Sequence, residues 1–247
     1  MRQIAILVVT AALSAAAAPA RHVDPLTGMP FVLLPAGAFT MGSPAAEAGR
    51  EAQERRHRVT VGRAFYLGVY EVTQAEWTSV MGTNPSASAG CGRCPVERIN
   101  YLDVARFIER LNARSPWPGF RLPSEDEWEY ACRAGGTAAY GAADTIDAAR
   151  ANVRGTRTQP VGSYAANAWG LFDMSGNVWE WTSTNYAPYA GARAPDGPAY
   201  TPDRKVIRGG SWLFDADSAR CALRYTHRPQ DSGPSLGFRL AHDAAAP

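Results

Sequence analysis

Hydrophobic and polar residues alternate along several short stretches of the chain, which is the pattern of half-buried β-strands. Residues 31–43 read F-V-L-L-P-A-G-A-F-T-M-G-S and predict two strands joined by a Pro-Ala-Gly turn as a hairpin. Residues 44–58 carry many charges and no hydrophobic period, and therefore predict a surface loop. Residues 59–72 alternate again, so we expect them to return to the sheet.

Three stretches carry the pattern of amphipathic helices with defined starts. Thr73 and Ser124 each stand three residues before a glutamate, which is the capping box that satisfies the free amides of a first helical turn. Between them, either Asn100 or Asp103 can begin a helix. One apolar stripe then follows at helical spacing: Val104, Phe107, Ile108 and Leu111. Because no linker interrupts the chain, we predict one mixed α/β domain, rich in irregular structure.

Residues 1–20 have the pattern of a secretory signal peptide. A basic start precedes an apolar run over residues 4–18, and the segment ends Ala-Pro-Ala. We expect cleavage after Ala20, which leaves residues 21–247 as an exported domain, periplasmic or secreted; an uncleaved N-terminal anchor is the alternative. No later segment approaches the roughly 20 apolar residues of a membrane helix, so we expect no membrane insertion after cleavage.

Composition and charge narrow the class of partner. The chain is 46% hydrophobic and 10% aromatic, which favours a packed globule. The net charge is only +2, with arginines and acids interspersed, so no nucleic-acid partner is expected.

Four cysteines in an exported chain predict disulfides. Cys91 and Cys94 form a C-x-x-C in a Ser/Gly/Pro-rich loop, whereas a thioredoxin-like site lies at the start of a helix, which lowers the thiol pKa. The pattern favours a local structural disulfide, with redox chemistry or a soft metal as the alternative. Two thiolates alone make a poor zinc site. Cys132 and Cys221 remain, and a bond between them would close a long loop.

Residues 169–181, W-G-L-F-D-M-S-G-N-V-W-E-W, carry candidate metal chemistry. Asp173, Asn177 and Glu180 supply three oxygen side chains, and a Ser-Gly pair lets the loop bend so that carbonyls point inward. Calcium takes such oxygen ligands. If the end of the stretch is extended, its two tryptophans share one face. The same residues also fit a tight turn before a half-buried strand, so spacing alone leaves both interpretations open.

Seven stretches together resemble the sulfatase-modifying-factor family, whose founding members are formylglycine-generating enzymes. In family order they are residues 35–42 (P-A-G-A-F-T-M-G), 71–73 (E-V-T), 94–97 (C-P-V-E), 121–130 (R-L-P-S-E-D-E-W-E-Y), 170–181 (G-L-F-D-M-S-G-N-V-W-E-W), 208–212 (R-G-G-S-W) and 237–239 (G-F-R). They span nearly the whole mature chain. The resemblance implies a compact single α/β domain of the formylglycine-generating-enzyme type, related to C-type lectins, poor in regular secondary structure and stabilised by calcium.

The resemblance also implies calcium ligands. It assigns one site to the side chains of Asp173 and Glu180 and the carbonyls of Gly176 and Val178. A second site would begin at Asn152 and Val153, but the downstream carboxylate loop that completes it in the family is missing. We therefore expect one ion.

Disulfides are implied in the same way. The resemblance pairs Cys132 with Cys221. A further family disulfide falls on Ile108 and Leu240, two apolar residues that can pack instead.

The chain departs from the family at its reactive centre. Formylglycine-generating enzymes carry two cysteines, five residues apart, that bind copper(I) and activate oxygen to oxidise a substrate cysteine. Here Phe214 or Ser211 stands at the first position and Ala216 at the second. Because Cu(I) needs soft thiolates, we expect neither copper nor formylglycine formation. Recruiting Cys91 and Cys94 instead would require a loop rearrangement.

Two function classes follow. The first is a non-catalytic binding or regulatory protein that recognises an envelope or secreted protein or peptide. The resemblance offers accessory proteins of type VI secretion and ligand-binding variable proteins as precedents. The second is a periplasmic oxidoreductase that acts on a peptide or small molecule without the copper-cysteine centre, as in siderophore maturation.

Polar residues after Trp212 are the candidates for either function: Asp215, Asp217, Arg220, Arg224, Tyr225, His227 and Arg228. Asp217, Arg224, Tyr225 and His227 are the acid-base candidates among them. Since no activated nucleophile accompanies them, the pattern favours a polar binding surface or a salt-bridged loop over an acid-base site. Trp212 and Phe214 could either line a binding cleft or pack in the hydrophobic core.

Overall fold

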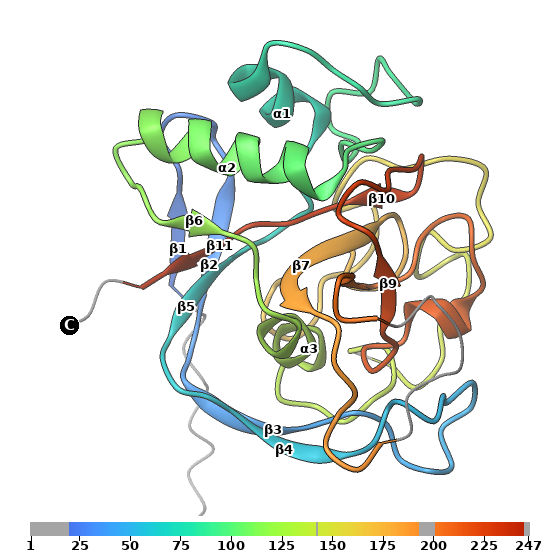
Figure 1. The fold of residues 1–247 in the computed structure, drawn as a ribbon. Coiled ribbons are helices and arrows are strands. Elements are labelled where there is room, and N and C mark those ends of the chain that lie inside the picture. Colours follow the sequence, from blue (N-terminus) through green and yellow to red (C-terminus); the bar gives the residue numbers. More distant parts are fainter. Residues whose placement is uncertain (1–19, 142, 193–200, 245–247) are drawn as a thin grey trace, which may run out of the picture.

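The computed structural model describes residues 20–141, 143–192 and 201–244, and its strands form three sheets (Figure 1). Most of the predicted signal peptide, residues 1–19, lies outside the described residues. The largest sheet has the order β1-β2-β5-β11-β6, with antiparallel neighbours throughout. Its strands are β1 (Arg21–Val23), β2 (Pro30–Leu34), β5 (Phe65–Gly68), β11 (Ala241–Asp243) and β6 (Phe120–Arg121). The first and last strands of the chain therefore share one sheet.

The second sheet holds the segments with the candidate chemistry. Its order is β10-β7-β8-β9, and only the β10–β7 pair is parallel. The strands are β7 (Trp179–Asn185), β8 (Lys205–Arg208), β9 (Tyr225–His227) and β10 (Leu236–Gly237). A separate ribbon pairs β3 (Gly37–Met41) with β4 (His57–Val61).

Three α-helices begin where the capping pattern predicts. They are α1 (Gln74–Met81), α2 (Tyr101–Arg114) and α3 (Glu125–Arg133), and each has a complete capping box at its N-cap, Thr73, Asn100 or Ser124. The third lies between β7 and the β3–β4 ribbon and contacts both (Figure 1). This helix therefore joins the ribbon to the second sheet.

The apolar stripe of α2 is confirmed as core. Val104, Phe107 and Leu111 are fully buried, and the Phe107 ring stacks on Trp77 with centroids 5.1 Å apart. Ile108 and Leu240 also pack in this cluster. The two apolar side chains thus take the place of the further family disulfide.

The first four residues of strand β7 are buried on both faces. Trp179 and Trp181 share one face, as predicted, and Glu180 on the other face is fully buried as well. Other parts of the chain therefore cover both faces at this end of the strand.

The predicted hairpin over residues 31–43 is wrong. Both strands form, but β2 pairs with β1 and β5, whereas β3 pairs with β4. The Tyr130 hydroxyl of α3 donates to the Pro35 carbonyl at 3.2 Å and lies 2.4 Å from the place of a Cβ on Gly37. The chain therefore runs past this tyrosine into the next sheet and does not reverse. Alternation predicts a strand, but it does not predict the strand's partner.

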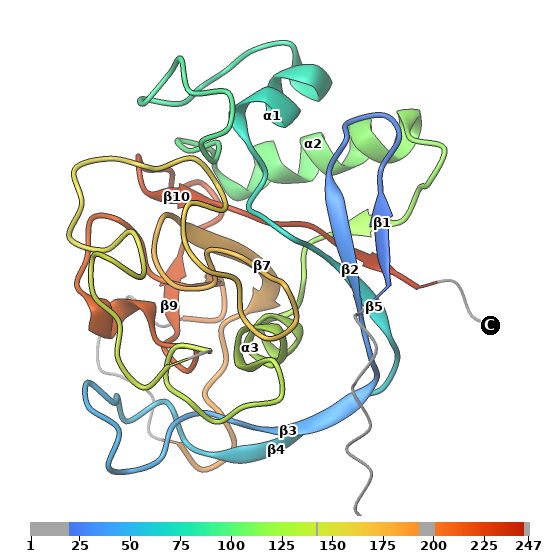
Figure 2. The ribbon, with the colours of Figure 1, turned by 180° about the vertical axis from the view of Figure 1, so that it is seen from behind.

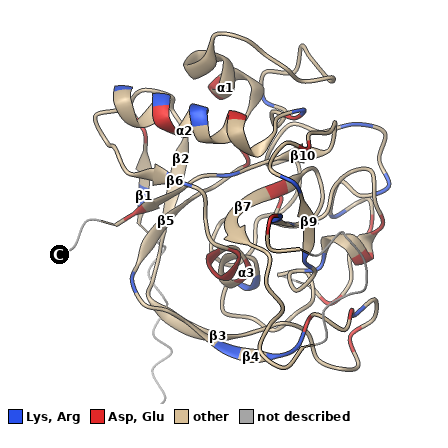
Figure 3. Cartoon of the chain, in the orientation of Figure 1, with Lys and Arg blue, Asp and Glu red and all other residues tan. Residues whose placement is uncertain are grey.

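Irregular structure dominates the middle of the chain. The described residues between 134 and 178 contain no helix or strand, and Figure 2 shows them as loops beside β7. A short 3-10 helix, η1 (Ala216–Ala219), follows β8. Basic and acidic residues are interspersed over the described elements (Figure 3). Among the described residues, no helix has both the length and the apolar character needed to cross a bilayer.

Candidate functional site

A groove lies over the segment between β8 and β9. Its volume is about 530 Å³. Gly210 makes the tight turn that leads into it, with φ 70°, and a Cβ there would lie 2.8 Å from Ala219. Only glycine fits this turn without displacing the backbone of η1.

Apolar side chains form one wall of the groove. Leu213, Phe214 and Tyr225 are 53%, 45% and 40% exposed, and all three line it together with Trp179. The Trp179 ring centroid lies 6.1 Å from that of Phe214 and 5.9 Å from that of Tyr225. Among the described residues, three of the six exposed large apolar side chains thus lie in this one groove, which is a feature typical of binding surfaces.

Carboxylates form another part of the wall. Glu51, Asp215 and Asp217 line the groove, and the last two also line an adjoining hollow of about 340 Å³. Glu51 accepts a hydrogen bond from the Gln53 amide, and Asp215 pairs with the exposed side chain of Arg154, which lines the hollow. The groove is therefore aromatic and acidic, and the hollow adds one ion-paired arginine.

Of the predicted acid-base candidates, Tyr225 and His227 are neighbours, with ring centroids 5.8 Å apart, but the four do not form one site. Asp217 and Tyr225 line the groove, but Arg224 is fully buried and its guanidinium binds both oxygens of Glu125 at 2.8 and 2.7 Å. The His227 ring contacts Asp231 at 3.2 Å. These contacts favour the binding-surface interpretation of the cluster.

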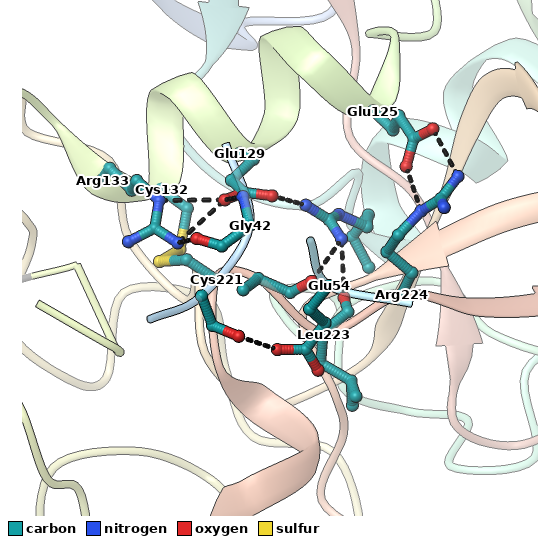
Figure 4. A network of polar contacts seen from close by, with 12 residues as sticks. Gly42, Glu54, Glu125, Glu129, Cys132, Arg133, Cys221, Leu223 and Arg224 are labelled. Atoms are coloured by element: carbon teal, nitrogen blue, oxygen red, sulfur yellow. Dashed lines mark hydrogen bonds and ion pairs between the residues drawn. A yellow bond between two sulfur atoms is a disulfide. The ribbon is translucent and has the colours of Figure 1, made fainter. Parts of the chain in front are cut away.

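Arg220 and Arg208 are buried in the same way. Arg220 binds both Glu54 oxygens at 2.7 Å, and Arg208 binds Glu129. Burial alone would lower the pKa of Arg208, but the Glu129 carboxylate outweighs it and raises that pKa. Figure 4 shows the buried pairs of Glu125 and Glu129 side by side along α3. These buried arginines therefore do not line the groove.

Both predicted disulfides are confirmed. Cys91 bonds to Cys94, and Cys132 bonds to Cys221. These bonds use all four cysteines of the chain. In this structure no free thiol is left to bind Cu(I). The family resemblance gives the positions of the two reactive cysteines to Ser211 or Phe214 and to Ala216.

We therefore expect no free thiol when the purified protein is unfolded without a reductant and titrated. After reduction the titration should give four thiols per chain. A non-reduced protein with two reactive thiols that bind Cu(I) would contradict the assignment.

The predicted calcium loop brings acidic groups together in the interior. Asp173 has φ 55°, and its Oδ2 accepts a hydrogen bond from the Gly162 amide at 2.7 Å. Burial raises the pKa of Asp173 to about 6. Glu180 is held by Arg239, which donates to both of its oxygens at 2.7 Å, and by the Trp128 indole at 2.7 Å.

Glu71, which sequence reasoning did not single out, belongs to the same region. It is 1% exposed, and neither of its carboxylate oxygens has a partner among the described residues. Burial, and then the nearby charge of Asp173, raises its pKa well above the usual value. In the sequence, Glu71 stands out only as the first residue of the E-V-T stretch that contributes to the family resemblance. Nothing in the local spacing of that stretch indicates a metal ligand.

The summed charge of the buried groups around the predicted calcium loop fits a divalent cation. Glu71, Asp173 and Glu180 carry three negative charges when ionised, and Arg239 supplies one positive charge. The remaining two negative charges match one Ca²⁺. No three His, Cys, Asp or Glu side chains within the described ranges are clustered closely enough to hold a metal by themselves, so carbonyl oxygens would have to complete the site.

Asn152 and Val153 have other contacts. The Asn152 amide donates to Asn177 Oδ1 and to the Arg157 carbonyl, both at 3.0 Å. The Val153 amide donates to the Ala151 carbonyl at 3.0 Å. Asn152 therefore ties two loops together.

Comparisons with known proteins agree with this fold. The family model described as the sulfatase-modifying factor enzyme 1-like domain matches residues 16–244. Serine/threonine-protein kinase pkn1 of Chlamydia caviae is 42% identical over 238 aligned positions, and the match covers 85% of this chain and 37% of that protein. Formylglycine-generating enzyme of Mus musculus is 27% identical, over 89% of this chain and 76% of that enzyme. This chain thus corresponds to little more than a third of the kinase's length.

A solved structure gives a similar result. PvdO from Pseudomonas aeruginosa has a TM-score of 0.79 at 29% identity, and the match covers 93% of this chain and 100% of that one. Treponema denticola variable protein 1 also has a TM-score of 0.79, at 26% identity, with 92% and 100% covered. The predicted formylglycine-generating-enzyme-like α/β fold is confirmed.

Proposed function

The chain belongs to the sulfatase-modifying factor enzyme 1-like family, and from this membership we propose that it is an exported, calcium-stabilised recognition protein without the family's oxidase chemistry. Its ligand is a basic segment of an envelope or secreted protein, bound in the groove beside β9. The protein acts as a binding or regulatory partner in the periplasm or outside the cell.

The groove carries this proposal. The family resemblance puts the two cysteines of formylglycine-generating enzymes at this groove, with Phe214 or Ser211 at the first position here and Ala216 at the second. Exposed aromatic faces next to carboxylates suit an arginine or lysine, because the ring faces attract the cation and the acids complement its charge. The adjoining hollow that shares Asp215 and Asp217 adds length, and this favours a peptide of several residues over a single amine.

Two further features support export and calcium. The N-terminal residues have a signal-peptide pattern, and all four cysteines form disulfides, which persist in oxidising compartments. Asp173, Glu180 and the carbonyls of Gly176 and Val178 would hold one Ca²⁺ and fix the irregular loops around β7. The ion's role is structural.

Binding of labelled peptides tests the groove. We expect peptides with two arginines to bind at least about tenfold more tightly than equal-length peptides with two glutamates. Phe214→Ala or Tyr225→Ala should weaken the arginine peptide by about 3- to 30-fold, because each removes one ring face. Fluorescence polarisation at low salt measures both effects.

Leu102 on α2 offers the matched control. It is 46% exposed and lies outside the groove, so Leu102→Ala should leave peptide affinity unchanged. Equal affinity for basic and acidic peptides, or unchanged binding in both aromatic variants, would overturn the proposed site. Tight binding of free arginine alone would point to a small cation as the ligand.

A further inference from the structure

Glu71 is a buried carboxylate without a visible partner. It lies just after β5, is 1% exposed, and neither Oε1 nor Oε2 accepts a hydrogen bond from another described residue. Buried carboxylates are normally paired or bound to metal, because an unpaired one loses its hydration without compensation. An explanation for Glu71 therefore has to be sought in its surroundings.

The fold holds Glu71 against the predicted calcium loop. The Phe172 amide donates to the Val69 carbonyl at 3.0 Å, and the Tyr70 ring lies 5.0 Å from the Phe172 ring. Arg239 bridges the same two segments, since its guanidinium donates to the carbonyls of Gly68 and Phe172 at 3.1 and 2.9 Å. Glu71 follows Tyr70 and Asp173 follows Phe172, so these contacts bring the two carboxylates into one region, and the charge of Asp173 acts on Glu71.

Glu180 is less free to bind an ion than Glu71. Arg239 occupies both Glu180 oxygens, and the Trp128 indole takes a second position on Oε2. Only part of its lone-pair capacity remains. Neither oxygen of Glu71 accepts a hydrogen bond from another described residue.

We propose that Glu71 is a further ligand of the same calcium ion as Asp173, Glu180 and the loop carbonyls, while Glu180 also positions Arg239. This inference rests on the proposed calcium site and adds a ligand from a segment about 100 residues earlier in the chain, so the ion would join β5 to the loop before β7. The alternative is a protonated Glu71 that is simply buried.

Substitution by glutamine separates the two cases. If Glu71 is a ligand, Glu71→Gln should weaken Ca²⁺ binding by about tenfold or more, because one anionic ligand is lost. Its melting temperature without calcium should equal or exceed that of the wild type, since a like-charge contact with Asp173 disappears. The increase in melting temperature on adding Ca²⁺ should shrink. Chelator competition and thermal unfolding with and without Ca²⁺ measure these quantities.

Glu97 supplies the matched control. It is also fully buried and has one oxygen without a partner, but no carboxylate lies near enough to raise its pKa. Glu97→Gln should leave Ca²⁺ affinity unchanged. Should Glu71→Gln fail to fold, Glu71→Met has a similar shape and gives the same comparison.

Terbium luminescence gives a second measurement on folded protein. Tb³⁺ in the wild-type site should show about one bound water fewer, from lifetimes in H₂O and D₂O, than in Glu71→Gln. Unchanged affinity and unchanged hydration in the variant would overturn the Glu71 assignment alone. A wild-type protein that binds neither Ca²⁺ nor Tb³⁺ would overturn the calcium proposal itself.

Discussion

Replacing Glu129 with glutamine should lower the free energy of unfolding by about 3–5 kcal/mol, because it leaves two buried guanidinium groups without a counter-charge. Glu129 is fully buried on α3. Its Oε1 accepts from Arg133 Nε and from the Gly42 amide, each at 2.9 Å, while Oε2 accepts from Arg208 (Figure 4). Urea unfolding of both proteins at neutral pH measures the difference.

An exposed ion pair provides the control for this prediction. Arg106 pairs with Asp103 at 3.4 Å and is 66% exposed, so Arg106→Gln should change the stability by less than about 0.5 kcal/mol. A Glu129→Gln variant as stable as the control would mean that Arg133 and Arg208 find other acceptors. The carbonyls of Gly42 and Leu223, which already accept from them at 2.8 Å, are the nearest such groups.

The sequence predicts correctly those helices whose first residues are set by neighbours in the chain. Thr73, Asn100 and Ser124 fix the starts of the helices because the cap and its partner are three residues apart. Strand partners are set by distant contacts. The Tyr130 hydroxyl, 95 residues from Pro35, donates to the Pro35 carbonyl between β2 and β3, and no spacing within residues 31–43 predicts that contact.

Prediction of the site was limited in the same way. Spacing placed Asp173 and Glu180 on one loop, but it could not show that Arg239 already holds Glu180 or that Glu71 reaches the same region. From the sequence, the cluster after Trp212 could form an acid-base site, a polar binding surface or a salt-bridged loop. Its members separate because arginines pair with acids from other elements: Arg220 with Glu54 and Arg224 with Glu125. A one-dimensional pattern cannot distinguish a buried arginine from an exposed one.

Removal of the disulfide between Cys132 and Cys221 should have the second large effect on stability. The two residues are 89 positions apart and fully buried. In the loop-entropy model the bond is worth about 4–5 kcal/mol. The double substitution Cys132→Ala with Cys221→Ala should therefore lower the free energy of unfolding by about that amount. Equilibrium unfolding in guanidinium without a reductant measures the change.

The bond between Cys91 and Cys94 tests whether loop length sets the stabilisation by a disulfide. Cys91 and Cys94 are only three positions apart, so the same model gives about 2 kcal/mol for their replacement by alanine. Equal losses in the two double variants would show that loop length does not set the stabilisation. The long-range bond also ties the C-terminal end of α3 to the segment that carries Leu213 and Phe214. Its removal should therefore weaken binding of the arginine peptide as well, whereas loss of the Cys91–Cys94 bond should not, because neither of those cysteines lines the groove.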